Sequence, residues 1–302
     1  MKNHTAVILI ALGGPRSLDD VGPFMAAFMG RPAPPPVVTA VIERYKLIGG
    51  KSPLPELVKA QADALEKELG SEYRAYEGFR YSSPTVAEAF ERAIKQGARR
   101  VIALSMSPFA TEITTGAYKS ACDALGSEET CPLFIPSWHD NPLFIESWAE
   151  KIRSGLARFP ETQRDSIVNI FTSHSIPIRY IVAGDPYQKQ VEECVQLVVE
   201  KTGIKNWRVA WQSKGSRASE PWIGPEVEPT MDKIAGEGYK NVLEIPIGFT
   251  CDHMETLYDI DIVHRAHAKK LGINFERAES LNTSPIFIKA LADIVKKNYL
   301  IY

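Results

Sequence analysis

Short apolar runs alternate with amphipathic stretches along the whole chain. The run Val7–Ala11 is apolar without interruption, which is typical of a parallel strand that is covered on both faces. Similar runs recur through both halves of the chain, and we predict about four strands in each half. The predicted strands are Val7–Ala11, Tyr73–Tyr81, Val101–Met106, Leu133–Pro136, Ile167–Ser173, Trp207–Gln212, Val242–Phe249 and Ile273–Ala278.

Helices are predicted between these strands from their periodicity and from their start and stop residues. One example has Asp185 as N-cap, Pro186 at the first helical position and Gly203 as the stop, which is a common arrangement of these residues. By contrast, Pro23–Val38 is predicted to be irregular because of its prolines. The predicted helices are Pro55–Leu69, Val86–Gln96, Thr115–Leu125, Pro142–Arg158, Asp185–Lys201, Glu226–Gly236, a long helix that ends near Lys270, and Pro285–Tyr299.

The alternation of strands and helices predicts an α/β fold with parallel sheets. Because the second half repeats the order of the first, we expect two Rossmann-like, doubly wound domains that are related by internal repetition and close on a cleft. The expected domains are residues 1–160 and 161–302, with the boundary in Arg158–Arg164. The last helix is free to pack back on the first domain.

Composition narrows the class of protein. The chain has 302 residues, of which 44% are hydrophobic and 24% are charged, as in ordinary globular proteins. A net charge of −2 does not favour nucleic acid as a partner. The four cysteines are scattered, which indicates neither a disulfide framework nor a zinc site. With no long apolar run and no room for a signal peptide before the first strand, we expect a cytoplasmic protein, and peripheral membrane contact stays open.

Several familiar motifs are incomplete. The first strand leads into Gly13-Gly14-Pro15 and not into the glycine pattern of dinucleotide-binding proteins. Gly50-Lys51-Ser52 resembles the end of a phosphate-binding loop, but Tyr45 stands where the first glycine is required. No G-x-S-x-G motif surrounds the serines beside His174, so a nucleophile elbow is not predicted.

Candidate chemistry gathers at two strand ends. His174 follows the first strand of the second half, and His253, Glu255 and Asp259 follow the strand that begins at Val242. Ligand sites of open parallel sheets lie at this carboxyl edge. His174 could instead be a histidine satisfied by a backbone carbonyl. Asp252-x-x-Glu255 also matches a capping box, but the nearby imidazole and the second carboxylate favour a divalent cation such as Fe²⁺, Co²⁺ or Zn²⁺.

Two other groups of residues receive less specific interpretations. His264 and His267 lie far along the predicted helix, and we expect both to be solvated. The methionine and phenylalanine side chains of Pro23–Met29 form either a lip over a flat apolar ligand or a packed surface loop.

Several motifs together resemble the ferrochelatase family. The resemblance runs from about Val7 to the last helix, in order and without large gaps. It rests on Leu12-Gly13-Gly14-Pro15, Arg44-Tyr45 followed by Gly49-Gly50 and Ser52-Pro53, Ser173-His174-Ser175-Ile176-Pro177, Gly184-Asp185-Pro186-Tyr187, Trp211-Gln212-Ser213, and Pro246–Asp261. Ferrochelatases insert Fe²⁺ into a porphyrin in haem biosynthesis, so the resemblance implies this activity and a chelatase-like fold of two domains enclosing the macrocycle.

The resemblance also implies roles for single residues. His174 corresponds to the proton acceptor and metal ligand, Glu255 to its partner, His253 to a supporting catalytic residue, and Asp259 to part of an acidic row that guides the metal. The residues that correspond to porphyrin contacts are Leu12, Arg44, Tyr45, Ser52 and Tyr118. Ferrous iron and the porphyrin are then substrates, no tightly bound cofactor is expected, and a monomer and a homodimer are both compatible.

The chain departs from the family pattern in three places. Val263 stands where the acidic row of relatives often continues, Leu12 stands where some coproporphyrin-type relatives have a tyrosine iron ligand, and no cysteine follows Cys251. We therefore expect a shorter metal path and no iron–sulfur cluster. Coproporphyrin III and protoporphyrin IX stay open as substrates. The alternatives are a cobalt or nickel chelatase for another tetrapyrrole and a non-catalytic haem or metal carrier.

Overall fold

The computed structural model describes residues 4–125, 131–215 and 220–299. The chain divides into two compact units. The first contains Met1–Trp138, Cys251–Met254 and Asn282–Tyr302, and the second contains His139–Thr250 and Glu255–Leu281. The division after Trp138 differs from the expected boundary near residue 160, because the helix that follows packs within the second unit.

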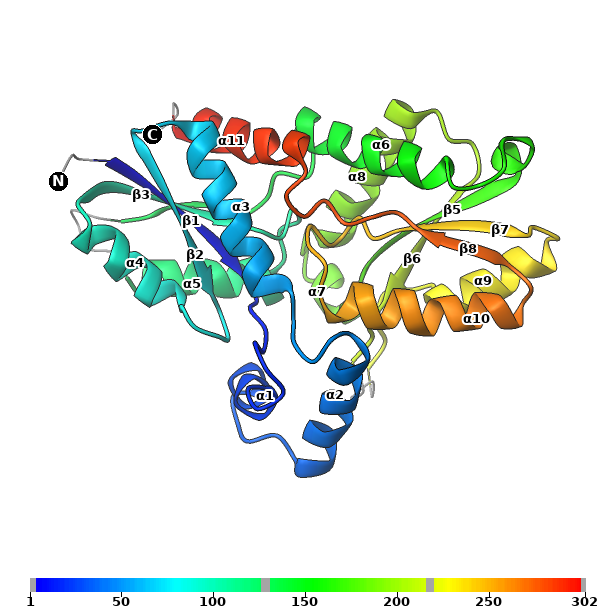
Figure 1. The fold of residues 1–302 in the computed structure, drawn as a ribbon, viewed down its shortest axis with the longest axis horizontal. Coiled ribbons are helices and arrows are strands. Elements are labelled where there is room, and N and C mark those ends of the chain that lie inside the picture. Colours follow the sequence, from blue (N-terminus) through cyan, green and yellow to red (C-terminus); the bar gives the residue numbers. More distant parts are fainter. Residues whose placement is uncertain (1–3, 126–130, 216–219, 300–302) are drawn as a thin grey trace. The chain divides into compact units, whose positions relative to one another are not determined.

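Each unit contains one four-stranded parallel sheet within the described residues. The strand orders are β2-β1-β3-β4 and β6-β5-β7-β8, so the second sheet repeats the first, as the sequence predicted. This topology confirms the α/β fold with two doubly wound sheets (Figure 1). The strands are β1 (His4–Ala11), β2 (Tyr73–Phe79), β3 (Ala98–Ser105), β4 (Leu133–Ile135), β5 (Ile167–His174), β6 (Trp207–Gln212), β7 (Asn241–Ile245) and β8 (Asn274–Arg277).

Helices connect these strands in both units. In the first unit they are α1 (Val21–Met29), α2 (Pro35–Leu47), α3 (Leu54–Leu69), α4 (Val86–Lys95), the π-helix η1 (Glu112–Gly116), α5 (Ala117–Asp123) and α11 (Pro285–Tyr299). In the second unit they are α6 (Pro142–Leu156), the short 3₁₀ helix η2 (Glu161–Ser166), α7 (Ile178–Val182), α8 (Tyr187–Thr202), α9 (Val227–Gly236), the π-helix η3 (Glu255–His264) and α10 (Arg265–Lys270).

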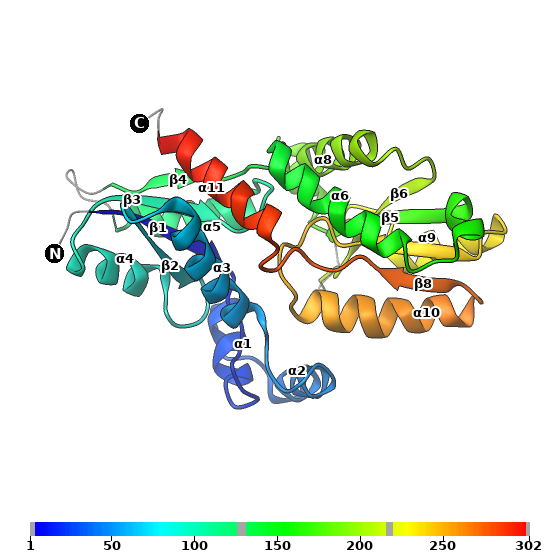
Figure 2. The ribbon, with the colours of Figure 1, turned by 45° about the horizontal axis from the view of Figure 1, so that its top comes forward.

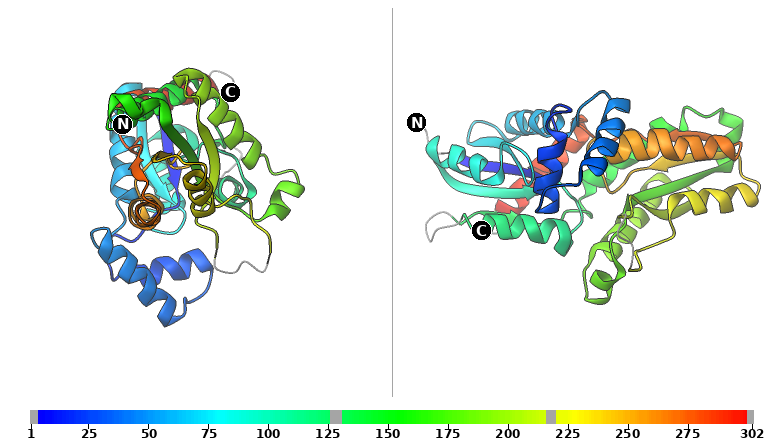
Figure 3. Two further views of the ribbon diagram at one scale, coloured as in Figure 1. Left: turned by 90° about the vertical axis from the view of Figure 1, so that its right-hand side faces the viewer. Right: turned by 90° about the horizontal axis from the view of Figure 1, so that it is seen from below.

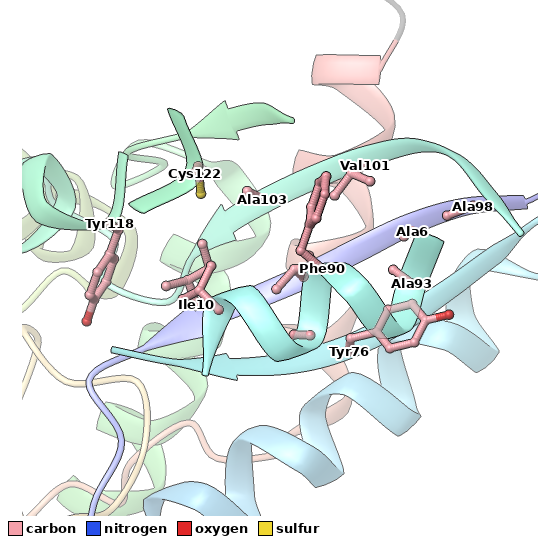
Figure 4. Close-up of a cluster of buried hydrophobic side chains, with 13 residues drawn as sticks. Ala6, Ile10, Tyr76, Phe90, Ala93, Ala98, Val101, Ala103, Tyr118 and Cys122 are labelled. Carbon is pink, nitrogen blue, oxygen red and sulfur yellow. The ribbon is translucent and has the colours of Figure 1, made fainter. Parts of the chain in front are cut away.

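In the first unit, helices cover both faces of the sheet. Alternate residues of β1, such as Ala6 and Ile10, pack with α4 and α5 in one buried cluster (Figure 4), as expected when successive side chains point to opposite faces. On the other face, α3 packs on β1 and β2, and α11 lies beside α3 (Figure 2). The last helix therefore completes the first unit.

The second unit has the same layered construction. Val168 and Ile170 of β5 pack with α9, η3 and α10 in a second buried cluster, and α9 and α10 lie along the same side of the sheet in Figure 1. On the other side, α6 packs on α8 and β7. A Cβ atom at Gly155 of α6 would lie only 2.9 Å from Leu243 of β7. This close approach explains why α6 belongs to the second unit.

The predicted elements that the structure corrects include one loop and one strand. Pro23–Val38 was expected to be irregular, but most of it lies in α1 and α2, which lie side by side in Figure 3. The prolines allow this because Pro23 lies in the first turn of α1 and Pro35 begins α2, where no intrahelical N–H donor is needed. The strand predicted to reach Phe249 ends at Ile245, since Pro246 cannot donate to a ladder.

Within the described part of the chain, we find no helix with both the length and the apolar character required to span a membrane.

Candidate active site

Predicted site residues of the second unit meet at the carboxyl edge of its sheet. His174 is the last residue of β5, and the strand register places it opposite Gln212, the last residue of β6. The neighbouring strand β7 leads through a loop to η3, which begins at Glu255. Because these parallel strands end at one edge, their terminal side chains share one region.

The His174 ring has a defined orientation. Its Nδ1 lies 2.5 Å from the carbonyl oxygen of Ser175. A carbonyl oxygen can only accept a hydrogen bond, so Nδ1 carries a proton, and in the neutral ring the lone pair is on Nε2. Ser175 is itself fully buried and held in place, because its amide donates to Gln212 O at 2.8 Å and its hydroxyl donates to Ile223 O at 2.7 Å.

The available nitrogen of His174 faces a carboxylate. His174 Nε2 lies 3.5 Å from Glu255 Oε1, and the two side chains remain 37% and 26% exposed. A neutral imidazole and an ionised carboxylate would direct two electron-rich atoms at each other. A positive charge placed between these two atoms would be stabilised by both of them, and either a proton or a metal cation can supply it.

Glu255 begins an unusual helix. The sequence predicted a single ordinary helix to Lys270, but Glu255–His264 is a π-helix, and only Arg265–Lys270 is α-helical. π-helical segments are rare and often occur at functional sites. The buried residues Thr256, Ile260 and His264 recur at every fourth position. Glu255 and Asp259, which precede two of these buried residues, are themselves only partly buried.

Gln212 links the two members of the pair, and sequence reasoning assigned it no role. Its main-chain oxygen accepts from the amide of Ser175, and its Nε2 donates to the carbonyl oxygen of Glu255 at 3.0 Å. Its Oε1 is buried with no hydrogen-bond partner among the described residues. The available signal was its place at the end of a predicted strand, within the Trp211-Gln212-Ser213 motif.

Asp259 lies at the same edge and is bound to the next residue of that motif. Ser213 Oγ donates to Asp259 Oδ2 at 2.6 Å. Ser213 has φ 59°, a left-handed conformation that is strained for a residue with a side chain. Within the described residues, no three His, Cys, Asp or Glu side chains form a group that could hold a metal ion. The structure therefore brings His174 and Glu255 together as a pair.

His253 lies in the short segment Cys251–Met254, which belongs to the first unit. His253 Nδ1 lies 3.0 Å from the carbonyl oxygen of Cys251. The Asp252 amide, which a capping box would use, donates to Asn282 Oδ1 at 2.9 Å, and Asn282 Nδ2 donates to Asp252 Oδ2 at 2.8 Å. The buried Gln61 of α3 contacts Cys251 Sγ at 3.0 Å and donates to Asn282 O at 2.7 Å. These bonds fix the segment that carries His253.

The expectation that His264 is solvated is wrong. This residue is 3% exposed, and its Nδ1 lies 3.0 Å from an oxygen of the fully buried Glu244 on β7. Burial acts to lower the pKa of His264, but the adjacent Glu244 carboxylate outweighs it, and the net pKa is raised above the ordinary value. His267 is partly exposed, and its Nε2 lies 2.8 Å from Asp232 Oδ1. His264 thus joins the end of η3 to a central strand.

The predicted porphyrin contacts all lie in the first unit. Tyr45 is the one buried residue of α2, and Tyr118 is also buried, which raises the pKa of its hydroxyl. The amide of the buried Ser52 donates to Pro15 O at 2.8 Å, so this residue lies against the loop after β1. Leu12 is partly buried in that loop, whereas Arg44 is exposed. Their contact with a porphyrin stays a prediction.

Comparisons with known proteins agree with this fold. The chain resembles SirB from Bacillus subtilis with Fe³⁺, with a TM-score of 0.61 and 13% identity over 98% of this chain and 95% of that one. It also resembles CbiX, the terminal enzyme for biosynthesis of siroheme in denitrifying bacteria, with a TM-score of 0.53 and 10% identity over 97% and 98% of the two chains. The chain thus has the two-sheet α/β fold of these proteins.

Sequence comparison gives the family. The ferrochelatase family model matches residues 4–299. A ferrochelatase from Citrifermentans bemidjiense is 38% identical over 98% of this chain and 99% of its own length. A coproporphyrin III ferrochelatase from Geobacillus sp. is 34% identical over 98% of each chain. The chain belongs to the ferrochelatase family.

Proposed function

We propose that this chain inserts Fe²⁺ into a porphyrin during haem synthesis, with the His174–Glu255 pair as its reactive centre. The observation that carries the proposal is the 3.5 Å approach of His174 Nε2 to Glu255 Oε1. The family match over residues 4–299 supports the reaction itself. Each insertion replaces two pyrrole protons by one dication, so the enzyme needs both a proton acceptor and an anionic group.

The orientation of His174 suits it to accept a proton. Because Nδ1–H donates to the Ser175 carbonyl, Nε2 is the nitrogen that accepts a pyrrole proton. The Glu255 carboxylate stabilises the resulting imidazolium, and both groups offer lone pairs to Fe²⁺ once the proton has left. Asp259, held by Ser213, adds negative charge on the metal path, and His253 is proposed to support the pair.

The porphyrin-binding role of the first unit is also a proposal. Arg44, Tyr45, Ser52, Tyr118 and Leu12 are the residues we propose to contact the macrocycle or its carboxylates. Of the two candidate porphyrins we favour coproporphyrin III, which has four carboxylates where protoporphyrin IX has two. The Geobacillus relative that is named for coproporphyrin III covers 98% of this chain, which supports this choice.

The proposed enzyme works without a resident cofactor or an iron–sulfur cluster. Fe²⁺ is a substrate. Cys122 and Cys194 are buried in α5 and α8, Cys251 is buried in the loop before η3, and Cys131 is exposed, a scattered distribution that supports the proposal. We further propose a cytoplasmic enzyme that acts as a monomer or homodimer.

The test is anaerobic turnover by the His174→Ala variant. Purified protein receives Fe²⁺ with coproporphyrin III or protoporphyrin IX, and the metalloporphyrin absorbance is followed. We expect wild-type product beyond one equivalent, and a loss of about 10²- to 10⁴-fold in kcat for His174→Ala, because a general base is removed.

His267→Ala is the matched control, since His267 lies at the surface beside Asp232 and outside the proposed site. Both variants are checked for an unchanged circular dichroism spectrum. Full activity of His174→Ala would exclude the assigned role of His174, and product limited to one equivalent would indicate a carrier. Faster turnover of protoporphyrin IX would contradict the proposed substrate.

A further inference from the structure

One motif of the sequence, Gly184-Asp185-Pro186-Tyr187, has no role in the proposed chemistry. The structure places its tyrosine directly behind the proposed base. Tyr187 is the first residue of α8 and is 6% exposed. Its hydroxyl donates to the carbonyl oxygen of His174 at 2.9 Å and lies 2.6 Å from Ser173 Oγ.

The directions of these two hydrogen bonds follow from the donors available. A tyrosine hydroxyl has one hydrogen, and here it is donated to the His174 carbonyl. The fully buried Ser173 hydroxyl must therefore donate to Tyr187. The result is a chain from Ser173 through Tyr187 to the main chain of His174, and hydrogen bonds in such chains strengthen each other by polarisation.

This bond completes the support of one peptide group. The peptide that joins His174 to Ser175 is held at its carbonyl by Tyr187 and at its N–H by Gln212 O, at 2.9 and 2.8 Å. The imidazole uses the next carbonyl, that of Ser175, to fix Nδ1. A rotation of this peptide would therefore shift both the ring and the carbonyl that orients it, and Nε2 would move relative to Glu255.

Tyr187 is itself held firmly. Its amide donates to Asp185 Oδ1 at 3.0 Å, and its ring lies beside Trp211 with centroids 5.7 Å apart. Burial raises the pKa of its hydroxyl, so the hydroxyl stays protonated and remains a donor throughout the neutral range.

Gly248 packs against the same cluster from the loop after β7. Its amide donates to Thr172 O, and there is no room for a Cβ atom at this position beside Ser173. The loop toward Glu255 thus closes over the same cluster.

We propose that Tyr187 is a positioning residue for His174. Its hydroxyl holds the His174–Ser175 peptide so that Nε2 stays aimed at Glu255. This inference rests on the proposed function, because it assigns Tyr187 an effect only through His174. It predicts that the hydroxyl affects the rate of the chemical step more than the binding of either substrate.

The test is Tyr187→Phe, which removes one oxygen and keeps the ring. We expect kcat for iron insertion to fall about ten- to a hundredfold, because small misplacements of catalytic groups have effects of this size. We expect KM for Fe²⁺ and for the porphyrin to change less than about threefold. Assays run well below the melting temperature of the variant separate this effect from loss of folded protein.

Tyr76→Phe is the matched control. Tyr76 is buried in the first unit, and its hydroxyl donates to Gln96 Oε1 at 2.9 Å; it is labelled in the cluster of Figure 4. Its removal leaves a comparable unpaired group far from His174 in the sequence. If Tyr187→Phe and Tyr76→Phe lower stability alike and both keep wild-type kcat, Tyr187 is only structural and the inference is wrong.

A double variant and a second single variant keep the test decisive. Combined with His174→Ala, Tyr187→Phe should cause no further loss in residual kcat, and an additive loss would contradict action through His174. Should Tyr187→Phe fail to fold, Ser173→Ala removes the first donor of the chain, and it should lower kcat with KM retained. Full activity of Ser173→Ala would then overturn the inference. Full activity of His174→Ala would instead refute the proposed function.

Discussion

The two sheets end in closely matching edges that differ in chemistry. β1 and β5 both have eight residues, and they end at Ala11 and His174. The register places Phe79 opposite Ala11 and Gln212 opposite His174. In each unit the third strand is followed by a π-helix whose first residue is a glutamate, namely Glu112 or Glu255.

The two units share the π-helix that begins with a glutamate, but only the second unit has a histidine at the end of its matching strand. Both edges have a π-helix that begins with a carboxylate, so this feature alone defines no function. At the first edge Ala11 and Phe79 are apolar, and the Glu112 carboxylate lies over its own helix, where a Cβ at Gly116 would be 2.9 Å away. At the second edge, His174 supplies a nitrogen for the carboxylate to face. The imidazole is therefore the difference on which we base the proposed proton and metal site.

The largest effect is expected when each of the two glutamates is neutralised in a separate variant. Glu255→Gln should lower kcat at least about a hundredfold, because the imidazolium and the metal lose their anionic partner. Glu112→Gln is the matched control and should stay within about twofold of wild type. Anaerobic turnover with Fe²⁺ measures both. Equal losses would show that the edges share the chemistry, and a Glu255→Gln variant that lost only thermal stability would favour a capping role.

The next largest effect is expected on stability when a side chain is added at Gly248, which lies against Ser173. A Cβ at Gly248 would lie 2.2 Å from Ser173 Oγ and 2.9 Å from Ser173 Cα, so a backbone atom blocks it. Gly248→Ala should therefore lower the free energy of unfolding by about 1–3 kcal/mol. Gly236→Ala, with no atom within 4 Å of its Cβ, should leave stability equal or slightly higher. Urea unfolding measures the free energy of unfolding of both variants. If Gly248→Ala were as stable as wild type, the loop that carries Gly248 would be able to move away from Ser173.

The smallest expected effect is the change in stability with pH that His264, the last residue of η3, causes. Because the folded-state pKa of His264 is raised, its protonated form stabilises the fold, and this contribution is complete below about pH 6.5 and is lost as pH rises through the folded pKa. Glu244, Glu228 and Asp259 are the acidic groups that raise it. The urea midpoint of wild type relative to His264→Gln should therefore fall as the pH rises above about 6.5. A difference that stayed constant with pH would mean that folding does not raise the pKa of His264.

Strong periodicity and turn residues made much of the fold predictable from the sequence. The bounds of β6 and α11 agree with the predicted Trp207–Gln212 and Pro285–Tyr299. The predictions were wrong where one residue type is compatible with two structures. Pro35 and Pro36 read as a break, although they begin α2, and His264 read as solvated because its partner, Glu244, lies twenty residues away on a strand.

The residues of the candidate pair could be predicted from the sequence, but the residues that hold them in place could not. His174, Glu255 and Asp259 stood out because imidazole and carboxylates at strand ends are chemically distinctive. Gln212 and Tyr187 did not, since their roles depend on which main-chain carbonyl each one reaches. Spacing also could not reveal the π-helix, because Glu255 and Asp259 are compatible with an α-helix as well. Hydrogen bonds to distant backbone groups leave no pattern in the sequence.

The division of the chain into units has a consequence for synthesis. The second unit needs residues up to Leu281, whereas the first needs α11, which begins at Pro285. Domains generally fold in the order in which the ribosome produces them. Here the unit that begins first is completed last, because α3 cannot pack against α11 until the chain is nearly finished. The growing chain must therefore keep the first unit from aggregating while that unit still lacks α11, at a time when all residues of the second unit have already been made.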